Sequence, residues 1–458
     1  ITATYNIRGF KTAMSDPDMG TYTYDYNALG LVIRQTNPDN QVATLEYNLL
    51  NELVKRTEPE GVSTWEYHNG NKAIGELNRV YLNNQILENH TFDALGRPAT
   101  TTYYRESERY TYSYAYHPTL GHLEEETYPG NTLTVKYLFN AYGYLTEVKN
   151  KATNVSYWKA NALDANDRVT SEQLGNGLLT QRTYNAATGF LERIRTGTSA
   201  QTEKHQDYRY TYSTLGNLIS RKEYFDSQLG NRSEVFEYDK LNRLTKTTGP
   251  LTVSQTYDAL GNITYKSDVG YYRYGENNTG PHVLTSIDHK DINVNSTLGA
   301  CTYPFNQGIQ LTSYNYVSLL ANQQGDSLKF SYGAGRERII QTVIKGGKLK
   351  WKKHYAGGKF EKLRYSSQYY DEVYFIQAGG AVIAFVERSQ RRETGSTTKT
   401  HYIHSDHLGS MSVLTDQNGT VERRMSHDPW GRAREATTWQ PYAAPPELAA
   451  SQRGFTFH

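Results

Sequence analysis

A short pattern recurs along most of the chain and constrains its fold more than any other feature. Most copies have an aromatic residue, usually followed by an acid or amide, then a turn and an alternating stretch, as in TYDALGNITYKSD at residues 256–268. Eleven copies align on one turn position, at intervals of 19 to 27 residues, and this position is Gly, Asn or Asp in all of them. The turn positions are Gly30, Asn51, Gly75, Gly96, Gly121, Gly143, Asp167, Gly189, Gly216, Asn242 and Gly261.

The turn position predicts a tight turn with a left-handed residue, because Gly, Asn and Asp tolerate positive φ at the least steric cost. The residues that follow have a period of two. In NITYKSD, Ile263 and Tyr265 fall on one face, while Thr264 and Lys266 fall on the other. This period indicates a strand, and a second short strand, VSQTYD, precedes the turn. Each copy is therefore predicted to be a β-hairpin.

One hairpin alone is marginally stable in water, whereas stacked hairpins pair edge to edge and bury their faces jointly. We therefore expect an all-β fold in which the hairpins stack into one long sheet that coils as it twists. The chain has 40 tyrosines and only 13 phenylalanines. Tyrosine suits a half-buried pleated surface and keeps a polar end, so this ratio favours broad sheets that are wetted on one face.

The repeated units resemble the YD repeats of the Rhs family. A second motif, YIHSDHLGSMSVLTDQNGTVERRMSHDPWGRAR at 402–434, is followed by RGFTFH and resembles the Rhs-associated core, although Phe457 stands where that core usually has Gly. The resemblance is clear from Tyr22 to about Asp268 and again from His401, and it is loose between 271 and 392. The core-motif residues are Asp406, Leu408, Gly409, Ser410, Asp416, Gly419, Asp428, Pro429, Gly431, Arg432, Arg453 and Gly454.

This resemblance implies a hollow β-shell, or part of one, that encloses and helps deliver a toxin domain by confinement rather than catalysis. The implied partners are a C-terminal toxin domain of the same parent polypeptide and secretion or toxin-complex components. The implied location is outside the cell or on its surface, through a bacterial secretion route. The family's self-cleaving Asp-Pro-x-x-Gly segment lies beyond the core, so DPWG at Asp428–Gly431 is not predicted to be a protease. We expect the chain to be a piece of a longer protein, since it lacks an initial Met and ends within the motif.

Three segments are expected along the chain. Residues 1–270 form the repeat array, 271–400 form degenerate hairpins with a polar loop near 388–401, and 401–458 hold the truncated core motif. The loop is expected because RSQRRETGSTTKTH is polar and short of apolar residues.

The histidines of HYIHSDH are the strongest candidates for chemistry. His401, His404 and His407 lie near Asp406, and such residues can bind zinc. On a strand, however, His401 and His404 face opposite sides. Packing within the shell is therefore the preferred interpretation, and we predict no metal, no cofactor and no catalytic residue.

Other candidates favour structural roles. We interpret the three glutamates at 124–126 as a solvated strand end, and Cys301, the only cysteine, as a small buried thiol. The basic stretch at 345–355 reads as a charged hairpin face. The formal net charge is +2, with basic residues scattered, so no nucleic-acid partner is expected. The longest apolar run, at 378–386, is too short to span a bilayer.

Two other functions stay open. The first is a bacterial cell-surface or extracellular scaffold for adhesion or carbohydrate binding. The second is a polysaccharide hydrolase built on the same sheets, which ranks last because no pair of carboxylates stands out.

Overall fold

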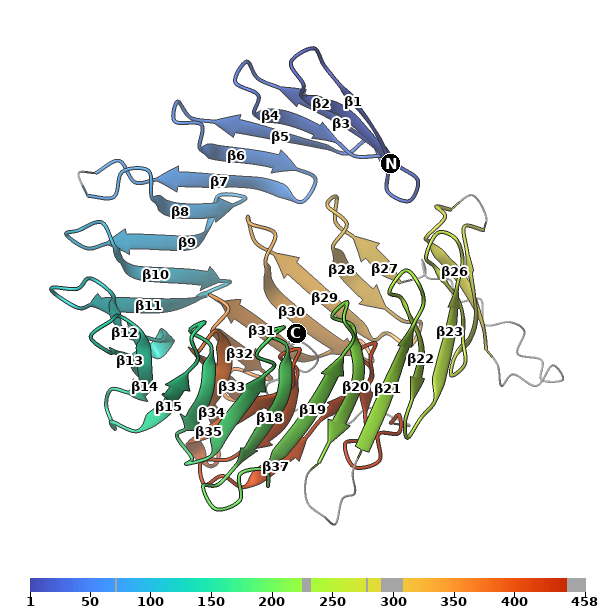
Figure 1. Cartoon of the computed structure of the whole chain (residues 1–458). Helices are drawn as coiled ribbons and strands as arrows, with labels where there is room; N and C mark the ends of the chain where they lie inside the picture. The colour runs from blue at the N-terminus through green and yellow to red at the C-terminus, as the bar shows by residue number, and fades with distance from the viewer. Residues whose placement is uncertain (71, 225–231, 277–278, 290–307, 443–458) are drawn as a thin grey trace. The chain divides into compact units, whose positions relative to one another are not determined.

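The computed structural model describes residues 1–70, 72–224, 232–276, 279–289 and 308–442 (Figure 1). These residues form strands β1 to β39 and one short 3-10 turn, η1 (Pro129–Asn131), and this described part contains no α-helix. The prediction of an all-β fold of stacked antiparallel hairpins is confirmed. The described residues include no helix long and apolar enough to cross a membrane.

The strands are short, and most are five to nine residues long. The first run comprises β1 (Thr2–Tyr5), β2 (Lys11–Asp16), β3 (Gly20–Tyr26), β4 (Val32–Thr36), β5 (Val42–Tyr47), β6 (Leu53–Glu58), β7 (Gly61–Tyr67), β8 (Leu77–Leu82), β9 (Gln85–Phe92), β10 (Pro98–Arg105) and β11 (Glu108–Tyr116). The second comprises β12 (Leu123–Thr127), β13 (Thr134–Phe139), β14 (Leu145–Asn150), β15 (Ser156–Leu163), β16 (Val169–Leu174), β17 (Leu179–Tyr184), β18 (Leu191–Gly197), β19 (Gln206–Tyr212), β20 (Leu218–Glu223), β21 (Arg232–Tyr238), β22 (Leu244–Thr248) and β23 (Val253–Tyr257).

The remaining strands follow in chain order. They are β24 (Ile263–Lys266), β25 (Gly270–Tyr274), β26 (Leu284–His289), β27 (Ile309–Leu311), β28 (Val317–Ala321), β29 (Ser327–Tyr332), β30 (Arg338–Lys345), β31 (Lys348–Ala356), β32 (Phe360–Arg364), β33 (Tyr370–Ala378), β34 (Ala381–Arg391), β35 (Gly395–Ser405), β36 (Met411–Thr415), β37 (Val421–Arg424), β38 (Ser426–His427) and β39 (Ala433–Arg434). The described strands form one sheet of 26 strands (β1–β26), one of 11 (β27–β37) and one of two (β38–β39). Strands that follow one another within a sheet pair antiparallel, as between β2 and β3, β21 and β22, and β35 and β36.

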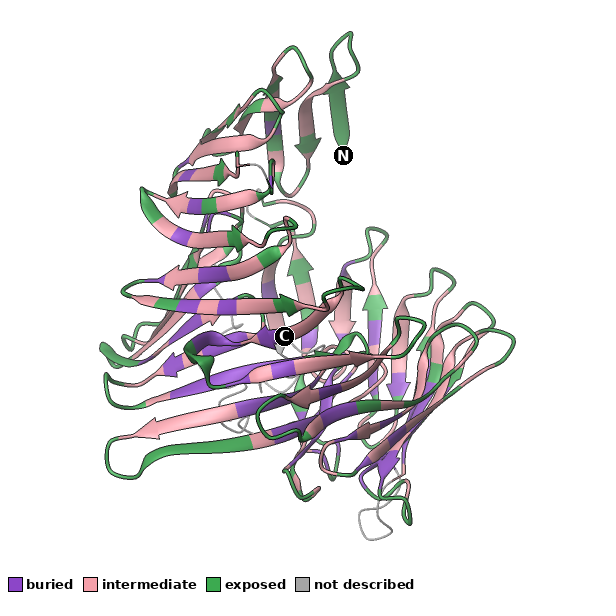
Figure 2. Ribbon diagram, turned by 90° about the vertical axis from the view of Figure 1, so that its left-hand side faces the viewer, coloured by how far each residue is buried: buried purple, intermediate pink, exposed green. Residues whose placement is uncertain are grey.

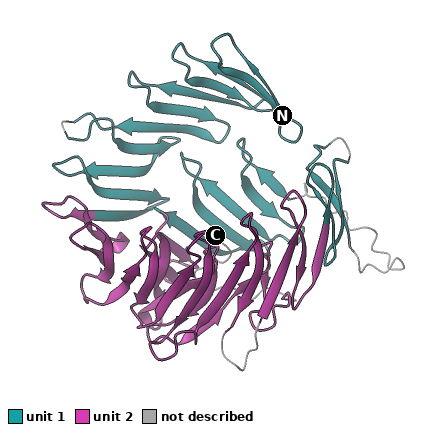
Figure 3. Ribbon diagram, in the orientation of Figure 1, with its two compact units in different colours: residues 1–113, 256–357 teal, residues 114–255, 358–458 magenta. Residues whose placement is uncertain are grey.

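The described chain divides into two compact units (Figure 3), and each draws on two distant segments. Unit 1 combines residues 1–113 with 256–357, and unit 2 combines 114–255 with 358–458. The units therefore cut across the three segments expected from the sequence.

In eight of the eleven repeats an acidic or amide residue builds the turn, and in the other three His68, His117 and Ser213 take its place. In the repeat at 256–268, the backbone N–H of Asp258 donates to the carbonyl of Asn262 at 3.0 Å, and Gly261 N–H donates to the Asp258 carbonyl at 3.2 Å. The Asp258 Oδ1 atom accepts from the N–H groups of Leu260 and Asn262, both at 2.9 Å. The side chain thus replaces backbone partners inside the turn. All eleven turn positions have φ between 60° and 96°.

A tyrosine hydroxyl links some repeats to the repeat before them. In five repeats this hydroxyl donates to the carbonyl of the residue two places after the preceding left-handed residue. These pairs are Tyr26 to Lys11 (2.8 Å), Tyr47 to Val32 (2.9 Å), Tyr67 to Leu53 (3.0 Å), Tyr238 to Leu218 (2.9 Å) and Tyr332 to Val317 (2.6 Å). Phenylalanine lacks this donor, which gives a physical reason for the excess of tyrosine.

Apolar cores are small and lie within each unit. In unit 2, Phe375, Phe385 and Ile403 form a buried cluster with Val373, Met411 and Leu414. Figure 2 shows buried residues alternating with partly buried and exposed ones along the strands. Many buried residues are polar, Glu126, Asp207 and Glu234 among them, at 1–2% exposed. The cores are therefore held by hydrogen bonds and ion pairs as well as by apolar burial.

The predicted polar loop near 388–401 is wrong. Strands β34 and β35 continue through this region and pair residue by residue from Ala384↔Tyr402 to Arg391↔Gly395. Arg388 Nε donates to Ser396 Oγ across the pair at 3.1 Å. The segment is polar because its outer half, from Gly395 to Lys399, is exposed on a strand end, and Thr favours strands despite its polarity.

Candidate functional site

The core motif contains three further turns of the repeat type. Asp406, Asp416 and Asp428 each accept two backbone N–H groups on Oδ1 at 2.7–2.9 Å, from the residues two and four positions later. The left-handed residues of these turns are Gly409, Gly419 and Gly431. The sequence interpretation missed this, although the spacing Asp-x-x-Gly recurs three times within the motif and carries the signal.

The remaining motif residues take places in or beside these turns. Leu408 and Ser410 donate their N–H groups to Asp406, and Ser410 is 1% exposed. Pro429 occupies the second position of the third turn, and Arg432 closes it with an ion pair to Asp428 Oδ2 at 3.2 Å. Both carboxylate oxygens of Asp428 are thus bound within its own turn. Arg453 and Gly454 lie outside the described residues.

The motif packs against strands that lie about 200 residues earlier in unit 2. Gln206 Nε2 donates to Ser412 Oγ at 2.8 Å and to the Ser405 carbonyl at 3.0 Å. Asn176 Nδ2 donates to Thr415 Oγ1 at 2.9 Å. Tyr128, fully buried, likewise donates to the Phe375 carbonyl at 2.8 Å. Side-chain hydrogen bonds of this kind fix the position of the late strands of unit 2 against its early segment.

A buried ionic cluster holds the end of the motif. Glu234 on β21 contacts Arg221 Nη2 at 2.5 Å and also binds Arg434 Nη1, and all three side chains are at least nine-tenths buried. Burial alone would raise the pKa of Glu234, but the two guanidinium groups lower it below its usual range. Trp439 stacks on Arg434 at 4.0 Å and on Arg221 at 5.3 Å. The cluster ties residues 434–439 to strands β20 and β21.

The candidate metal-binding histidines do not converge. His401 Nδ1 lies 2.5 Å from Glu422 Oε2, His404 Nε2 lies 3.0 Å from Thr415 Oγ1, and the His407 ring packs on Tyr210 at 4.5 Å. No three His, Cys, Asp or Glu side chains in the described part of the chain gather as metal ligands would.

The electrostatics of these histidines differ. Burial lowers the pKa of His404 to about 3, and the positive charges of His205 and Arg424 act in the same direction. Burial also lowers the pKa of His407 to about 4. Burial opposes protonation of His401 as well, yet hydrogen bonds to Glu387 and Glu422 raise its pKa above the ordinary value. His404 and His407 are therefore neutral near pH 7.

A cavity of about 650 Å³ lies beside the motif in unit 2 and is lined by His404, Asp406 and His407 among others. Both guanidinium groups in its lining are already paired, and Arg168 Nη2 lies 2.7 Å from Asp164 Oδ2. Arg182 Nη2 contacts Glu172 Oε1 at 2.6 Å, while Glu172 Oε2 accepts from Trp158 Nε1 at 2.6 Å. The cavity thus offers neutral imidazoles beside guanidinium groups whose charge is compensated.

The other sequence candidates take structural positions. Glu126 is not solvated, which corrects the expectation for the three glutamates: it is 2% exposed and binds Lys359 Nζ at 2.8 Å and Tyr137 at 2.7 Å. In the basic stretch at 345–355, Trp351 is 8% exposed and Lys352 pairs with Glu106 at 2.5 Å. Cys301 lies outside the described residues.

Comparison with known proteins gives one family and one fold. The family model named RHS Repeat matches residues 26–64. No curated protein matches the chain. The solved structure of TcdB2-TccC3 is 16% identical, with a TM-score of 0.78 over 95% of this chain and 27% of that chain. The structure of TcdB2-TccC3-TEV is also 16% identical, with a TM-score of 0.77 over 95% and 25%.

A third structure, the Tc holotoxin pore of Photorhabdus luminescens with a mutation in TccC3, is 15% identical, with a TM-score of 0.65 over 94% of this chain and 26% of that chain. The chain thus spans about a quarter of the length of the chains it matches. At this identity the likeness establishes the fold. The RHS Repeat match at residues 26–64 and the shared fold agree with the Tyr-Asp turns and support the resemblance of this chain to the Rhs/YD-repeat family.

Proposed function

We propose that this chain is part of the wall of a hollow β-shell that encloses a polypeptide cargo, a toxin domain located C-terminally in the parent protein. The observation that carries the proposal is the fold shared with TcdB2-TccC3 across 95% of the chain. The mechanism is confinement: a wall of hydrogen-bonded strands separates the cargo from solvent and from the producing cell until delivery. This role requires no catalytic residue and no cofactor.

The buried contacts of the core motif support this role. The Arg221–Glu234–Arg434 cluster fixes the described end of the chain against β20 and β21, so a segment that follows would leave from a defined place. Components of a toxin complex or secretion apparatus are the proposed partners, and the proposed route leads out of a bacterial cell.

Cryo-electron microscopy of the parent protein, with and without its C-terminal domain, tests the proposal. We expect difference density enclosed by β-strands, and we expect the C-terminal domain to resist trypsin for longer than when it is fused behind an unrelated carrier domain. Density outside the strands, together with equal digestion rates, would contradict confinement and favour an adhesion scaffold.

A further inference from the structure

An apolar ridge runs along one margin of the early hairpins of unit 1. The turns that hold the left-handed residues, here called repeat turns, follow β3, β5, β7 and β9 and lie along the same margin of this run (Figure 1). The turns on the opposite margin are the linking turns. In each of these repeat turns the residue before the left-handed one is large, apolar and 67–72% exposed. These residues, Leu29, Leu50, Ile74 and Leu95, form the ridge.

The fold of the turns does not account for the ridge. In the turn at 27–31, the N–H groups of Leu29 and Leu31 donate to Asn27 Oδ1 at 3.0 Å, so Leu29 takes part through its backbone alone. Neighbouring repeat turns are two strands apart, about 10 Å, and the four side chains therefore form a row of roughly 30 Å. Single exposed leucines need no explanation, whereas a contiguous apolar row indicates a surface that binds another molecule.

The repeat turns also carry a backbone donor that is free. In the turn at 27–31, the N–H of every residue except Ala28 is bound inside the turn. Ala28 N–H has no partner among the described residues, and the same holds for the equivalent N–H groups of Leu49 and Ala94. Each of these donors lies next to a ridge residue in the sequence. The margin thus offers an apolar side chain and an open N–H group at each of these three turns.

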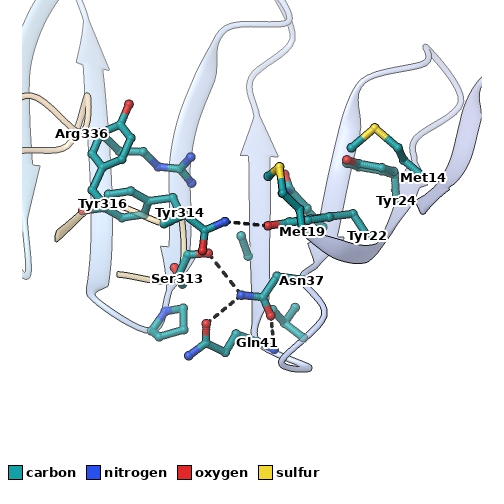
Figure 4. Close-up of a pocket in the computed structure, with 15 residues that line it drawn as sticks. Met14, Met19, Tyr22, Tyr24, Asn37, Gln41, Ser313, Tyr314, Tyr316 and Arg336 are labelled. Carbon is teal, nitrogen blue, oxygen red and sulfur yellow. Dashed lines mark hydrogen bonds between the residues drawn. The ribbon is translucent and has the colours of Figure 1, made fainter. Parts of the chain in front are cut away.

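The late hairpins of unit 1 show how such a turn is covered. The repeat turn at 312–316 follows β27, and its second N–H group, that of Ser313, donates to Glu60 Oε1 at 2.6 Å. Glu60 lies in the linking turn between β6 and β7. Figure 4 shows Asn37, from the preceding linking turn, bound through Nδ2 to the Ser313 carbonyl at 3.2 Å. Tyr314 occupies the position of a ridge residue and is partly buried there.

Other late turns of unit 1 meet early linking turns with the same chemistry. In the turn between β25 and β26, His282 N–H donates to Asp18 Oδ1 at 2.7 Å, and Asp18 belongs to the linking turn between β2 and β3. In the turn between β29 and β30, Arg336 Nη2 lies 2.8 Å from Glu58 Oε2, at the linking side of β6. Within unit 1, carboxylates on the linking margin of one run therefore bind the repeat margin of another run.

Two other occupants fit the ridge less well. A peptide that adds a strand needs a free sheet edge, but β3 is already paired with β2 and β4, and turns offer no such edge. A lipid surface is favoured by a surplus of Lys and Arg beside the apolar groups, but on this margin Arg8 and Lys72 are balanced by Glu52 and Glu76. Carboxylates presented by linking turns, by contrast, match the free N–H groups.

We propose that the ridge is a docking surface for a further run of the same kind of hairpins, which belongs to the parent protein and lies outside residues 1–458. Its linking turns would present carboxylates to the N–H groups of Ala28, Leu49 and Ala94 and cover the ridge, as Glu60 and Asn37 cover the turn at 312–316. This docking rests on the proposed function, because it takes the chain as one part of a longer wall.

Cysteine labelling of the parent protein and of residues 1–458 tests the docking. Native cysteines, Cys301 among them, are first replaced by Ser, and Leu29→Cys and Leu50→Cys are then introduced singly. We expect maleimide to react with each of them at least about tenfold more slowly in the parent than in residues 1–458, because a covered thiol is shielded from the reagent. The matched control, Gln85→Cys, lies at the opposite margin on β9, is exposed, and should react equally in both.

Hydrogen exchange gives a second measurement that needs no substitution. The N–H groups of Ala28 and Leu49 should exchange rapidly in residues 1–458 and at least about tenfold more slowly in the parent. Ser313 N–H, already bound to Glu60, should exchange slowly in both.

Equal labelling and equal exchange in the two proteins overturn the docking. Protection of the two cysteines that appears only when residues 1–458 dimerise, measured by sedimentation velocity, overturns it in favour of a second copy. Protection only on vesicles of phosphatidylcholine and phosphatidylserine overturns it in favour of a lipid surface. Slow labelling in a parent whose C-terminal domain lies outside the strands supports the docking and contradicts confinement alone. Fast labelling in a parent with enclosed density contradicts the docking alone.

Discussion

At the scale of single residues, the tyrosine hydroxyl acts as a cross-link between neighbouring repeats. Tyr238→Phe removes the 2.9 Å bond to the Leu218 carbonyl and leaves the ring in place. The free energy of unfolding should fall by about 0.5–1.5 kcal/mol, the net value of one such bond. Urea denaturation followed by circular dichroism measures it. Tyr142→Phe is the control, since Tyr142 is 86% exposed, and equal effects at the two sites would refute the cross-link.

The left-handed turn residue allows a second test at this scale. Asn51 has φ of 65° and an exposed side chain. Asn51→Val places a β-branched residue in this conformation and should cost roughly 1–2 kcal/mol more than Asn51→Gly, which carries no Cβ. The difference in urea midpoint between the two variants measures it. A valine variant as stable as the glycine variant would show that the turn relaxes to another conformation.

The chemistry of single residues explains why the turns could be predicted from the sequence and the tyrosine hydrogen bonds could not. Gly, Asn and Asp at the turn position predict positive φ because few residues tolerate it, and the structure places all eleven there. The carbonyl that each tyrosine binds lies 14 to 20 residues earlier, on another strand, so it became visible only with the register of the sheet.

At the scale of elements, a buried ion cluster fixes the end of the core motif to β21. Glu234→Gln removes the negative charge between Arg221 and Arg434 and leaves two buried guanidinium groups without their counter-charge. We expect a loss of about 3–5 kcal/mol, as when one partner of a buried pair is removed. Glu237→Gln is the control: it lies on the same strand, is 55% exposed and pairs with Lys246, so its loss should be below about 1 kcal/mol. Comparable losses of stability for Glu234→Gln and Glu237→Gln in denaturant titrations would contradict this role of the ion cluster.

Buried histidines, among them His404 on β35, should make the stability of the fold depend on pH. The pKa of His404 is about 3 in the folded chain, against about 6.5 when unfolded. Between pH 6.5 and 4.5 the unfolded chain therefore binds a proton that the folded chain does not, and stability falls as pH falls, by about 1.4 kcal/mol per pH unit for one such group. Burial also lowers the pKa of His205, His407 and His427, which adds to the slope with the same sign.

Urea midpoints at pH 7.5, 6.5, 5.5 and 4.5 measure this slope. His404→Gln keeps a polar group beside Thr415 and should flatten it. His401→Gln should not flatten it, because the pKa of His401 is raised and its contribution has the opposite sign. If stability depends on pH as steeply in His404→Gln as in the unmodified chain, the buried imidazole of His404 is not the cause of this dependence.

The structure of a segment could be predicted from the sequence where its own residue pattern determines it, but not where residues distant in the chain determine it. The hairpins follow from alternation and turn residues. The segment 388–401 was misread as a loop because its polarity belongs to the exposed end of a strand pair. Glu126 was misread as solvated because Lys359 and Tyr137, which bury it, lie on other strands.

At the scale of the whole molecule, each compact unit is assembled from an early and a late segment, and buried contacts join the two segments in each unit. In unit 1, Arg56 Nη2 donates to the Ala334 carbonyl at 2.6 Å, and in unit 2, Tyr128 donates to the Phe375 carbonyl at 2.8 Å. A fragment of residues 1–255 loses both partners and exposes the apolar groups they cover. We expect it to bind the dye ANS and to unfold without a sharp transition, as partly packed states do.

The complementary fragment, 256–458, should restore the fold when the two pieces are expressed together, because the missing contacts are between segments and need no covalent link. Co-purification in a 1:1 ratio, loss of ANS binding and a melting transition near that of the intact chain are the expected results. If residues 1–255 alone melt as sharply as the intact chain, the early segment is self-sufficient, and the late segment is not needed to complete either unit.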